Sequence, residues 1–494
     1  MNKSAISPTR QEDFPGWYQE VIKAADLAEM AHVRGCMVIK PWGYGIWERI
    51  RDLLDKEIKA RGHENAYFPL FIPLSYIQKE ADHVEGFAKE MAVVTHHRLE
   101  QRDGHLVPGG ELEEPIVVRP TSEAIIGASM SQWIQSYRDL PLLLNQWANV
   151  VRWEMRPRVF LRTSEFLWQE GHTAHSTQQE AMDETIEMFG VYESFAQEVL
   201  CVPVVAGEKP PSERFPGADR SFSIEAMMQD GKALQAGTSH FLGQNFAKSA
   251  DIKFLDHTGE LCYAYTTSWG VSTRLIGALV MTHGDDDGLC VPPRVAPHQV
   301  VISPITRGEP VDADVLAYAR KCSQGLFGST YCSEPLRVKV DDRLIKSVDK
   351  KWQWLKRGVP VLVEIGPRDL EAGTVTFRKR TSFYEADTMK LDDFIVQVPN
   401  LLGEVQDELL DRARSNLESN ILTDEIDLSA ARAYLDQGNG FLLAKWCGDS
   451  ACEVAFKEQA ATIRCLPRDR KAKGTVCVVC SRPATTDAIF AQSY

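Results

Sequence analysis

The 494-residue sequence lacks features that would identify several classes of protein. It has no apolar run near the roughly 20 residues that a helix needs to cross a bilayer. Its first residues carry acids early and contain no apolar segment of the kind found in signal peptides. Neither a Gly-x-Gly-x-x-Gly fingerprint nor a Gly-Lys-Ser/Thr phosphate loop occurs. We therefore expect a cytoplasmic protein in which arginines and an antiparallel sheet, rather than a helix N-terminus, would have to hold a nucleotide.

Positive charge is also scarce, since 55 Lys and Arg against 69 Asp and Glu give a net charge of −14. That total does not exclude nucleic-acid binding, because the local field decides it. Residues 343–380 contain ten Lys or Arg against four acids, a surplus of six positive charges. This stretch predicts a phosphate-binding surface, with a solvated charged face as the alternative.

The eleven cysteines do not indicate a disulfide framework, because their number is odd and no secretory signal precedes them. Four of them have metal-binding spacing: Cys447 and Cys452 form one pair, and Cys477 and Cys480 form another 24 residues later. Two such pairs predict a tetrahedral structural zinc site. Cys465 lies between the pairs and leaves the ligand set open, and four buried thiols without metal are the alternative.

The pattern along the chain indicates an α+β protein with three domains. Residues 1 to about 60 have helical periodicity, and the next 230 residues alternate short β-branched runs with helical patterns. A proline-rich break at residues 289–300 precedes alternating strands and helices that predict a small α/β sheet. From about Leu401 a helix leads into the region with the paired cysteines. We predict domains at 1–290, 291–400 and 401–494.

Three segments carry most of the chemistry. Residues 152–175, RWEMRPRVFLRTSEFLWQEGHTAH, combine arginines, acids, an aromatic and two histidines, and predict an ATP-handling strand, hairpin loop and strand. Residues 266–277, TTSWGVSTRLIG, predict a strand of small residues entering a helix that bears Arg274. Residues 62–71, GHENAYFPLF, fit a looser pattern in which a helix leads to a strand ending at a proline, here Pro69. In this order they resemble motifs 2, 3 and 1 of class II aminoacyl-tRNA synthetases.

Four further segments narrow the resemblance to the prolyl-tRNA synthetases: PTSE (120–123), WQEGH (168–172), RFPGA (214–218) and LQAGTSHFLGQNF (234–246). The paired cysteines and the terminal FAQSY resemble the archaeal and eukaryotic type. The resemblance implies an antiparallel-sheet catalytic domain, an α/β anticodon-binding domain and a small zinc-binding α+β domain. It also implies ATP-dependent activation of L-proline with Mg²⁺, transfer to the 3′-terminal ribose of tRNA(Pro), and a homodimer formed through motif 1.

Arginine suits the activation step, because its planar fork binds phosphate or carboxylate and stays protonated. By resemblance, Arg152 contacts the α-phosphate and the substrate carboxylate, and Arg274 contacts the far phosphates and stacks under adenine. These two are the expected catalytic residues. The other expected ATP positions are Glu154, Arg162, Phe166, Gln235 and Thr238.

Proline brings a secondary ammonium with two N–H donors and an apolar ring, so its site needs acceptors and a rigid aromatic slot. Thr121 and Glu123 can be the acceptors, and Arg152 is shared with ATP. The remaining expected proline positions are Trp168, Glu170, His172, Phe215 and His240. Neither histidine is expected to act as a general base, because the amino-acid carboxylate is already ionised.

For the anticodon, whose guanines offer donors as well as acceptors, the resemblance indicates Glu364, Arg368, Arg378 and Lys379, with Arg343 and Lys339 as weaker candidates. The long bacterial type carries an editing domain between motifs 2 and 3, whereas only about 90 residues separate Gly171 from Thr266 here. We therefore expect no editing in cis and measurable activation of alanine and cysteine.

Two other interpretations remain open at this point. One is a synthetase-like protein that binds RNA or a polymerase partner without catalysis. The other is an amino-acid ligase that acts on a protein or carrier, although such relatives generally lack an anticodon-binding domain. Charging of tRNA separates them.

Overall fold

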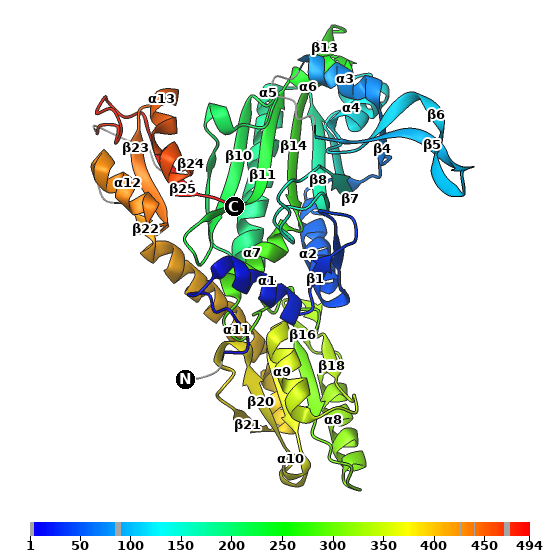
Figure 1. Ribbon diagram of the computed structural model, residues 1–494, viewed down its shortest axis with the longest axis vertical. Helices are drawn as coiled ribbons and strands as arrows, with labels where there is room; N and C mark the ends of the chain where they lie inside the picture. Colours follow the sequence, from blue (N-terminus) through cyan, green and yellow to red (C-terminus); the bar gives the residue numbers. More distant parts are fainter. Residues whose placement is uncertain (1–3, 84–89, 424–425, 439, 469–474) are drawn as a thin grey trace.

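The computed structural model describes residues 4–83, 90–423, 426–438, 440–468 and 475–494 (Figure 1). At its centre is an 11-stranded sheet with the strand order β22-β23-β25-β24-β9-β10-β11-β14-β8-β7-β3. Neighbouring strands from β9 to β7 are antiparallel, as the sequence predicted. The strands of this part are β7 (Leu142–Val151), β8 (Glu165–His175), β9 (Val204–Glu208), β10 (Arg220–Met227), β11 (Ala233–Gly243) and β14 (Tyr265–Ser272). Beyond β7, the short strand β3 (Glu64–Asn65) pairs with it in parallel.

Two helices, α5 (Gln178–Ser194) and α7 (Arg274–His283), pack on one face of this sheet. Alternation along β8 explains which residues face them, because successive side chains of a strand point to opposite faces. Gln169 points to the helical face, where its side chain accepts a hydrogen bond from Tyr192 of α5 at 2.6 Å. Glu170 and His172 therefore point to the other, open face.

The expected loop and second strand of motif 2 are confirmed as residues 152–164 and β8, but the first strand, β7, ends at Val151, just before the segment begins. The expected strand and helix of motif 3 are confirmed as β14 and α7. Motif 1 is confirmed in part. Helix α2 (Pro41–Lys59) leads to β3, which has only two residues and ends at Asn65 rather than at Pro69. The buried Arg119 side chain donates to the Phe68 carbonyl at 2.7 Å. This hydrogen bond, rather than pairing with a neighbouring strand, holds the backbone just before Pro69.

The prediction that the N-terminal region is helical throughout is wrong at residues 28–30. Helix α1 (Phe14–Ala24) ends just before Asp26, whose backbone is left-handed with φ of 59°. The chain then forms the antiparallel pair of β1 (Ala28–Met30) and β2 (Met37–Ile39). Tertiary pairing thus overrides the helical pattern of AADLAEMA.

A long hairpin extends from the catalytic domain (Figure 1), made of β5 (Ala92–Arg102) and β6 (His105–Val118). Its base pairs with β4 (Phe71–Pro73) and lies near α3 (Leu74–His83). The remaining elements of this domain are α4 (Glu123–Trp133), η1 (Tyr137–Asp139), η2 (Phe195–Val199), η3 (Pro211–Glu213), α6 (Asn245–Ala250), β12 (Lys253–Leu255) and β13 (Leu261–Tyr263).

The predicted small α/β sheet is confirmed below the catalytic domain in Figure 1, with the strand order β18-β15-β19-β20-β21. A core cluster of its own includes Ile302, Val363 and Phe394. The elements are β15 (Val300–Pro304), α8 (Asp312–Leu326), β16 (Thr330–Tyr331), β17 (Glu334–Pro335), β18 (Val338–Val340), α9 (Ser347–Arg357), β19 (Val361–Ile365), α10 (Pro367–Ala372), β20 (Thr374–Lys379), η4 (Arg380–Ser382) and β21 (Asp387–Lys390).

Helix α11 (Leu391–Ser419) joins this domain to the last one (Figure 1). It starts ten residues before the expected Leu401 and passes through Pro399, so the predicted boundary at 400 falls inside one helix. The last domain contains β22 (Ile421–Leu422), α12 (Leu428–Asp436), β23 (Phe441–Trp446), α13 (Ser450–Glu453), η5 (Val454–Gln459), β24 (Ala461–Pro467) and β25 (Thr486–Gln492).

The last domain is fused to the catalytic sheet by β24, where Leu466 and Pro467 pair with Glu208 and Gly207 of β9. A Cβ on Gly207 would overlap the Leu466 carbonyl oxygen, so this junction needs a residue without a side chain. Within the described ranges, no helix has both the length and the apolar character that crossing a membrane requires.

Candidate active site

A cavity of about 270 Å³ opens on the face of the central sheet opposite α5 and α7. Strand register explains its shape. Ser268 on β14 lies between His172 on β8 and His240 on β11, and Gly270 lies between Glu170 and Thr238. The central strand therefore forms a low floor of small residues, and the two flanking strands provide the taller walls.

One wall holds a buried acid and histidine pair. The Glu170 carboxylate accepts hydrogen bonds from Ser122 Oγ at 2.5 Å and Gln146 Nε2 at 2.8 Å, and lies 2.9 Å from His172 Nε2. Burial alone would raise the pKa of Glu170, but these partners outweigh it and lower the pKa. Burial would likewise lower the pKa of His172, but Glu170 and Glu123 raise it. Both pKa shifts favour the ionic form of the pair, in which the imidazole is protonated.

Thr121 and Glu123 sit beside this pair at the start of α4, where the Thr121 hydroxyl donates to the Glu123 carboxylate. Glu123 is 9% exposed and lines the cavity. These groups are acceptors within a largely enclosed pocket, which is the arrangement that the sequence predicted for a secondary ammonium.

Aromatic rings form the remaining walls. Phe215 stacks on His240 with ring centroids 4.8 Å apart, and Phe166 meets Trp168 edge to face at 6.1 Å. Burial, together with the charges of Lys209 and His172, lowers the pKa of His240 to about 3, so its imidazole is neutral. The cavity thus offers a rigid aromatic slot beside charged groups.

Two arginines enter the cavity from the ends of strands. Arg152, directly after β7, donates to the Pro120 carbonyl at 2.8 Å, and its guanidinium lies 5.3 Å from the Trp168 ring centroid. Arg274, the first residue of α7, donates to the Leu161 carbonyl at 3.2 Å. Burial, and next the charge of Arg162, lower the pKa of Arg274 to about 10. Cations held close together in this way favour an anionic ligand.

Twelve of the fourteen residues predicted for ATP and proline line this one cavity. Glu154 and Arg162 are the two that do not. The Glu154 carboxylate accepts from the Arg156 backbone N–H at 2.9 Å, and Arg162 is exposed on the loop between β7 and β8, where its backbone pairs with that of Arg158. The twelve are Thr121, Glu123, Arg152, Phe166, Trp168, Glu170, His172, Phe215, Gln235, Thr238, His240 and Arg274.

Sequence reasoning missed other residues of the cavity wall. Lys209 directly follows β9 and Ser221 lies on β10, two strands to which the motif comparison assigned no function. Nothing in the local sequence around Lys209 distinguishes it from a surface lysine. Only the pairing of its backbone N–H with the Ser221 carbonyl, at 2.8 Å, places it beside the cavity.

The predicted anticodon residues are only partly close together. Glu364 on β19 accepts from Arg378 Nε at 3.1 Å and from Lys351 Nζ at 3.2 Å. Lys379 instead points to α11, where it pairs with Glu404 and Glu408 at 2.9 and 2.7 Å. Arg368 is exposed on α10.

Internal pairing also reduces the free charge of residues 343–380. Arg343 pairs with Asp341 at 2.7 Å, and Arg380 is buried against Asp285 of the catalytic domain. Seven of the ten basic side chains are engaged in this way within the protein: Arg343, Lys350, Lys351, Arg357, Arg378, Lys379 and Arg380. The predicted phosphate-binding surface is therefore weaker than the count of charges indicates.

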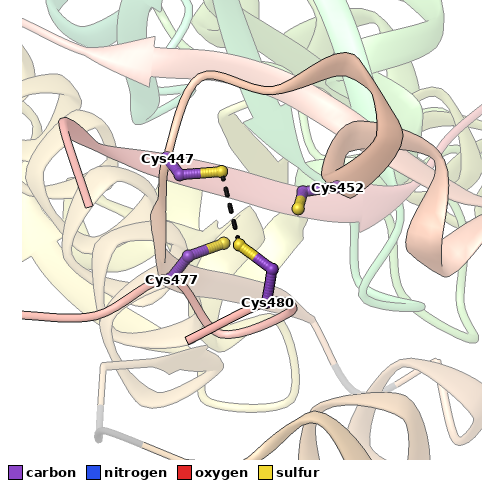
Figure 2. Close-up of side chains that lie close together, drawn as sticks. All are labelled: Cys447, Cys452, Cys477 and Cys480. Atoms are coloured by element: carbon purple, nitrogen blue, oxygen red, sulfur yellow. Dashed lines mark hydrogen bonds between the residues drawn. The ribbon is translucent and has the colours of Figure 1, made fainter. Parts of the chain in front are cut away.

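The four paired cysteines form one cluster, with their sulfur atoms all within 4.8 Å of one another. Figure 2 shows Cys447, Cys477 and Cys480 close together, with Cys452 facing them from α13. Cys447 and Cys480 have sulfur atoms 3.7 Å apart, close to the edge of about 3.8 Å that follows from tetrahedral Zn–S bonds of about 2.3 Å. Cys465 lies outside the cluster, with its sulfur 3.9 Å from the Val205 carbonyl.

Comparison with known proteins agrees with this architecture. Residues 109–283 match the tRNA synthetase class II core domain (G, H, P, S and T), residues 299–401 match the anticodon binding domain, and residues 428–494 match the C-terminal domain of prolyl-tRNA synthetase. The fold and the cavity are those of a class II aminoacyl-tRNA synthetase.

The relatives identify the family. The proline–tRNA ligase of Paramagnetospirillum magneticum is 55% identical, over 100% of this chain and 99% of the relative. A crystal structure of prolyl-tRNA synthetase from Cryptosporidium parvum complexed with L-proline and AMP has a TM-score of 0.89 and 37% identity, covering 99% of this chain and 97% of that one. A second structure, complexed with halofuginone and AMPPNP, has a TM-score of 0.87, 37% identity and the same coverage. The chain belongs to the prolyl-tRNA synthetase family and is a proline–tRNA ligase.

Proposed function

We propose that the cavity binds L-proline and MgATP, forms prolyl adenylate, and passes the prolyl group to the 3′-terminal ribose of tRNA(Pro). The observation that carries this proposal is the convergence in one cavity of an acceptor cluster, an aromatic slot and two arginines. The Cryptosporidium parvum relative, solved with L-proline and AMP and separately with AMPPNP, supports the binding of proline and an adenine nucleotide here.

In the activation step, a proline carboxylate oxygen attacks the α-phosphorus, the bond from that phosphorus to the bridging oxygen breaks, and pyrophosphate leaves. Arg152 binds the proline carboxylate and the α-phosphate, and Arg274 binds the leaving phosphates. Both arginines stabilise the negative charge that develops on the phosphate oxygens in the transition state. Mg²⁺ bound with ATP would supply further positive charge to the phosphates. Thr121 and Glu123 accept from the ammonium, and Trp168, Phe215 and the Glu170–His172 pair enclose the ring.

Phe166, Gln235 and Thr238 are the proposed contacts to the adenine and ribose of ATP. Glu154 and Arg162, on the adjoining loop, are the other two proposed ATP contacts. Both loop residues lie outside the cavity wall, so their roles require the loop between β7 and β8 to close over ATP. In transfer, the terminal ribose hydroxyl of tRNA attacks the adenylate carbonyl, and AMP leaves with the bonding electrons.

We further propose that this enzyme has no editing module in cis. The course of the chain between β8 and β14 supports this, because β9, β10 and β11 all join the catalytic sheet. Discrimination against alanine then rests on the pocket, where each missing methylene costs about 1 to 3 kcal/mol. Alanine and cysteine should support measurable pyrophosphate exchange, and failure to detect either adenylate would contradict the proposal.

Recognition of tRNA is assigned to the domain around β19 and β20. The Glu364 carboxylate, with Arg378 and Lys351 beside it, offers an acceptor flanked by donors, which matches the donors and acceptors of guanine. Arg368 and Lys379 are assigned weaker contacts with the tRNA. For Lys379, the tRNA has to compete with the ion pairs that this lysine makes with Glu404 and Glu408.

Structural zinc is assigned to Cys447, Cys452, Cys477 and Cys480, whose spacing and sulfur geometry fit a closed tetrahedral site. This site would stabilise the fold of the last domain without taking part in the reaction. Together with the similarity to the eukaryotic Cryptosporidium parvum enzyme, it supports the archaeal and eukaryotic type, although the bacterial relative shares the full length. A homodimer through motif 1 and a cytoplasmic location stay predictions.

The test is proline-dependent exchange of pyrophosphate into ATP, followed by transfer of proline to tRNA(Pro). Both activities are expected in the wild-type enzyme. Exchange without transfer would favour a ligase for another acceptor, and neither activity would favour a protein that binds RNA without catalysis.

A further inference from the structure

A buried charge cluster connects the last domain to the cavity. Glu225 on β10 is 0% exposed and uses both carboxylate oxygens. Oε1 accepts from Lys209 Nζ at 2.7 Å, and Oε2 accepts from Arg464 Nε and Nη2, each at 3.2 Å. A buried carboxylate is costly unless it is paired in this way. Burial would raise the pKa of Glu225, but Lys209 and Arg464 outweigh it and lower the pKa.

The three residues come from different parts of the chain. Lys209 directly follows β9, and Arg464 lies on β24 of the last domain, which pairs with β9 next to Gly207. The Ser223 hydroxyl also donates to Glu225 Oε1, at 2.8 Å. A lysine ammonium has three N–H donors. Among the described contacts, Lys209 uses one of them, in its hydrogen bond to Glu225. Since Lys209 lines the cavity, its other donors are available to a ligand there.

We propose that Arg464 is a positioning residue of the proline pocket, which holds Glu225 and thereby fixes the Lys209 ammonium in the cavity wall. The inference rests on the proposed function of that cavity. Two cations against one acid leave the cluster with a net positive charge, beside a pocket that receives a carboxylate and an acyl phosphate. The last domain then completes the active site, in addition to extending the sheet.

The competing explanation is an interdomain ion pair that only holds the two sheets together. Arg468 provides a control, because it directly follows β24 and lies 3.9 Å from Glu193 of the catalytic domain. Its contacts among the described residues, which also include the Phe189 ring and the Ala206 carbonyl, do not reach the cavity wall. A purely structural role predicts that Arg464→Met lowers stability, as removing one partner of a buried pair does, without a selective change in KM for proline. A positioning role predicts a change in proline binding for Arg464→Met alone.

The experiment measures KM for proline, KM for ATP and kcat by pyrophosphate exchange in the full-length enzyme, with thermal unfolding recorded in parallel. We expect Arg464→Met to raise KM for proline roughly 10- to 100-fold, as small displacements of positioning groups do, with kcat unchanged because the lost interaction is one of ground-state binding. Arg464→Lys should restore most of this loss, and Arg468→Met should leave KM for proline unchanged.

A double-mutant cycle with Glu225→Gln tests whether the effect passes through the carboxylate. In the Glu225→Gln background, Arg464→Met should have no further effect on KM for proline. If Arg464→Met does not fold, Arg464→Gln, which keeps a donor toward Glu225 without the charge, replaces it in the cycle. Additive effects, or equal effects of Arg464→Met and Arg468→Met, would overturn the inference. A wild-type enzyme without proline-dependent exchange would instead overturn the proposed function, and the inference with it.

Discussion

Replacing His172 by Gln should destabilise strand β8 by leaving Glu170 as a buried carboxylate without its cation. Glu170 is 3% exposed, and His172 Nε2 lies 2.9 Å from it. Removing one partner of a buried pair costs about 3 to 5 kcal/mol. We expect the lower end, about 3 kcal/mol, because Ser122 and Gln146 still donate to the carboxylate.

The double variant Glu170→Gln with His172→Gln removes the carboxylate as well and should recover most of that loss, since it leaves no unpaired buried charge. Amide hydrogen exchange of β8 measures both local opening energies. Proline binding should be lost in both variants, because the pair also forms the pocket wall. This reasoning would be refuted if β8 in His172→Gln had the same opening free energy as in the wild type. It would also be refuted if the double variant were as unstable as His172→Gln.

The same pair predicts a pH dependence. The pKa of His172 is raised above 6.5 in the folded state, so its contribution to stability is complete below that value and is lost as pH rises through the raised pKa. The pKa of Glu170 is lowered below 4.5, so its contribution is present above 4.5 and is lost as pH falls through the lowered pKa. Protection of β8 should therefore be greatest between these limits, and the double variant should have a flatter profile.

Three further predictions concern other parts of the molecule. Gly171→Ala should lower stability by about 1 to 3 kcal/mol, because the added Cβ would overlap the Trp269 ring. Thermal unfolding of this variant at the wild-type temperature would contradict the prediction. Gly190→Ala is the control, because Gly190 on α5 has open space where the Cβ would be added. Cys452→Ser should reduce zinc, measured by elemental analysis, from about one ion per chain to a labile fraction, whereas Cys465→Ser should retain it; equal zinc in both would argue against the four-cysteine site. Arg378→Met should lower tRNA charging with little change in pyrophosphate exchange, and equal losses in both assays would show a structural effect instead.

The sequence was most informative where function lies in contiguous segments. Motif 2 supplies Arg152 and the residues of β8 within one hairpin, and strand alternation then places Glu170 and His172 on the same face. The antiparallel sheet and the α/β domain follow from the same local patterns. These features could be predicted because each depends on residues that are near one another in the chain.

The parts that could not be predicted depend on distant contacts. The pairing of β9 with β10 brings Lys209 to Glu225, and Arg464 joins them only because β24 pairs with β9. No local pattern encodes the pairing of β24 with β9. Similarly, the sequence predicts Lys379 as an unpaired cation, but in the fold α11 places Glu404 and Glu408 beside it. Charge counts along a chain do not show which charges the fold neutralises.

We propose that Arg152 joins the proline carboxylate and the α-phosphate in one cavity. The most direct test is proline-dependent pyrophosphate exchange and tRNA charging by Arg152→Ala, with Arg156→Ala, which replaces an exposed arginine of the same loop, as the control. Arg152→Ala should lose both activities by at least about 100-fold, as removal of one transition-state donor does, while Arg156→Ala should retain them. Exchange by Arg152→Ala at the rate of the control would show that Arg152 does not hold the reacting groups.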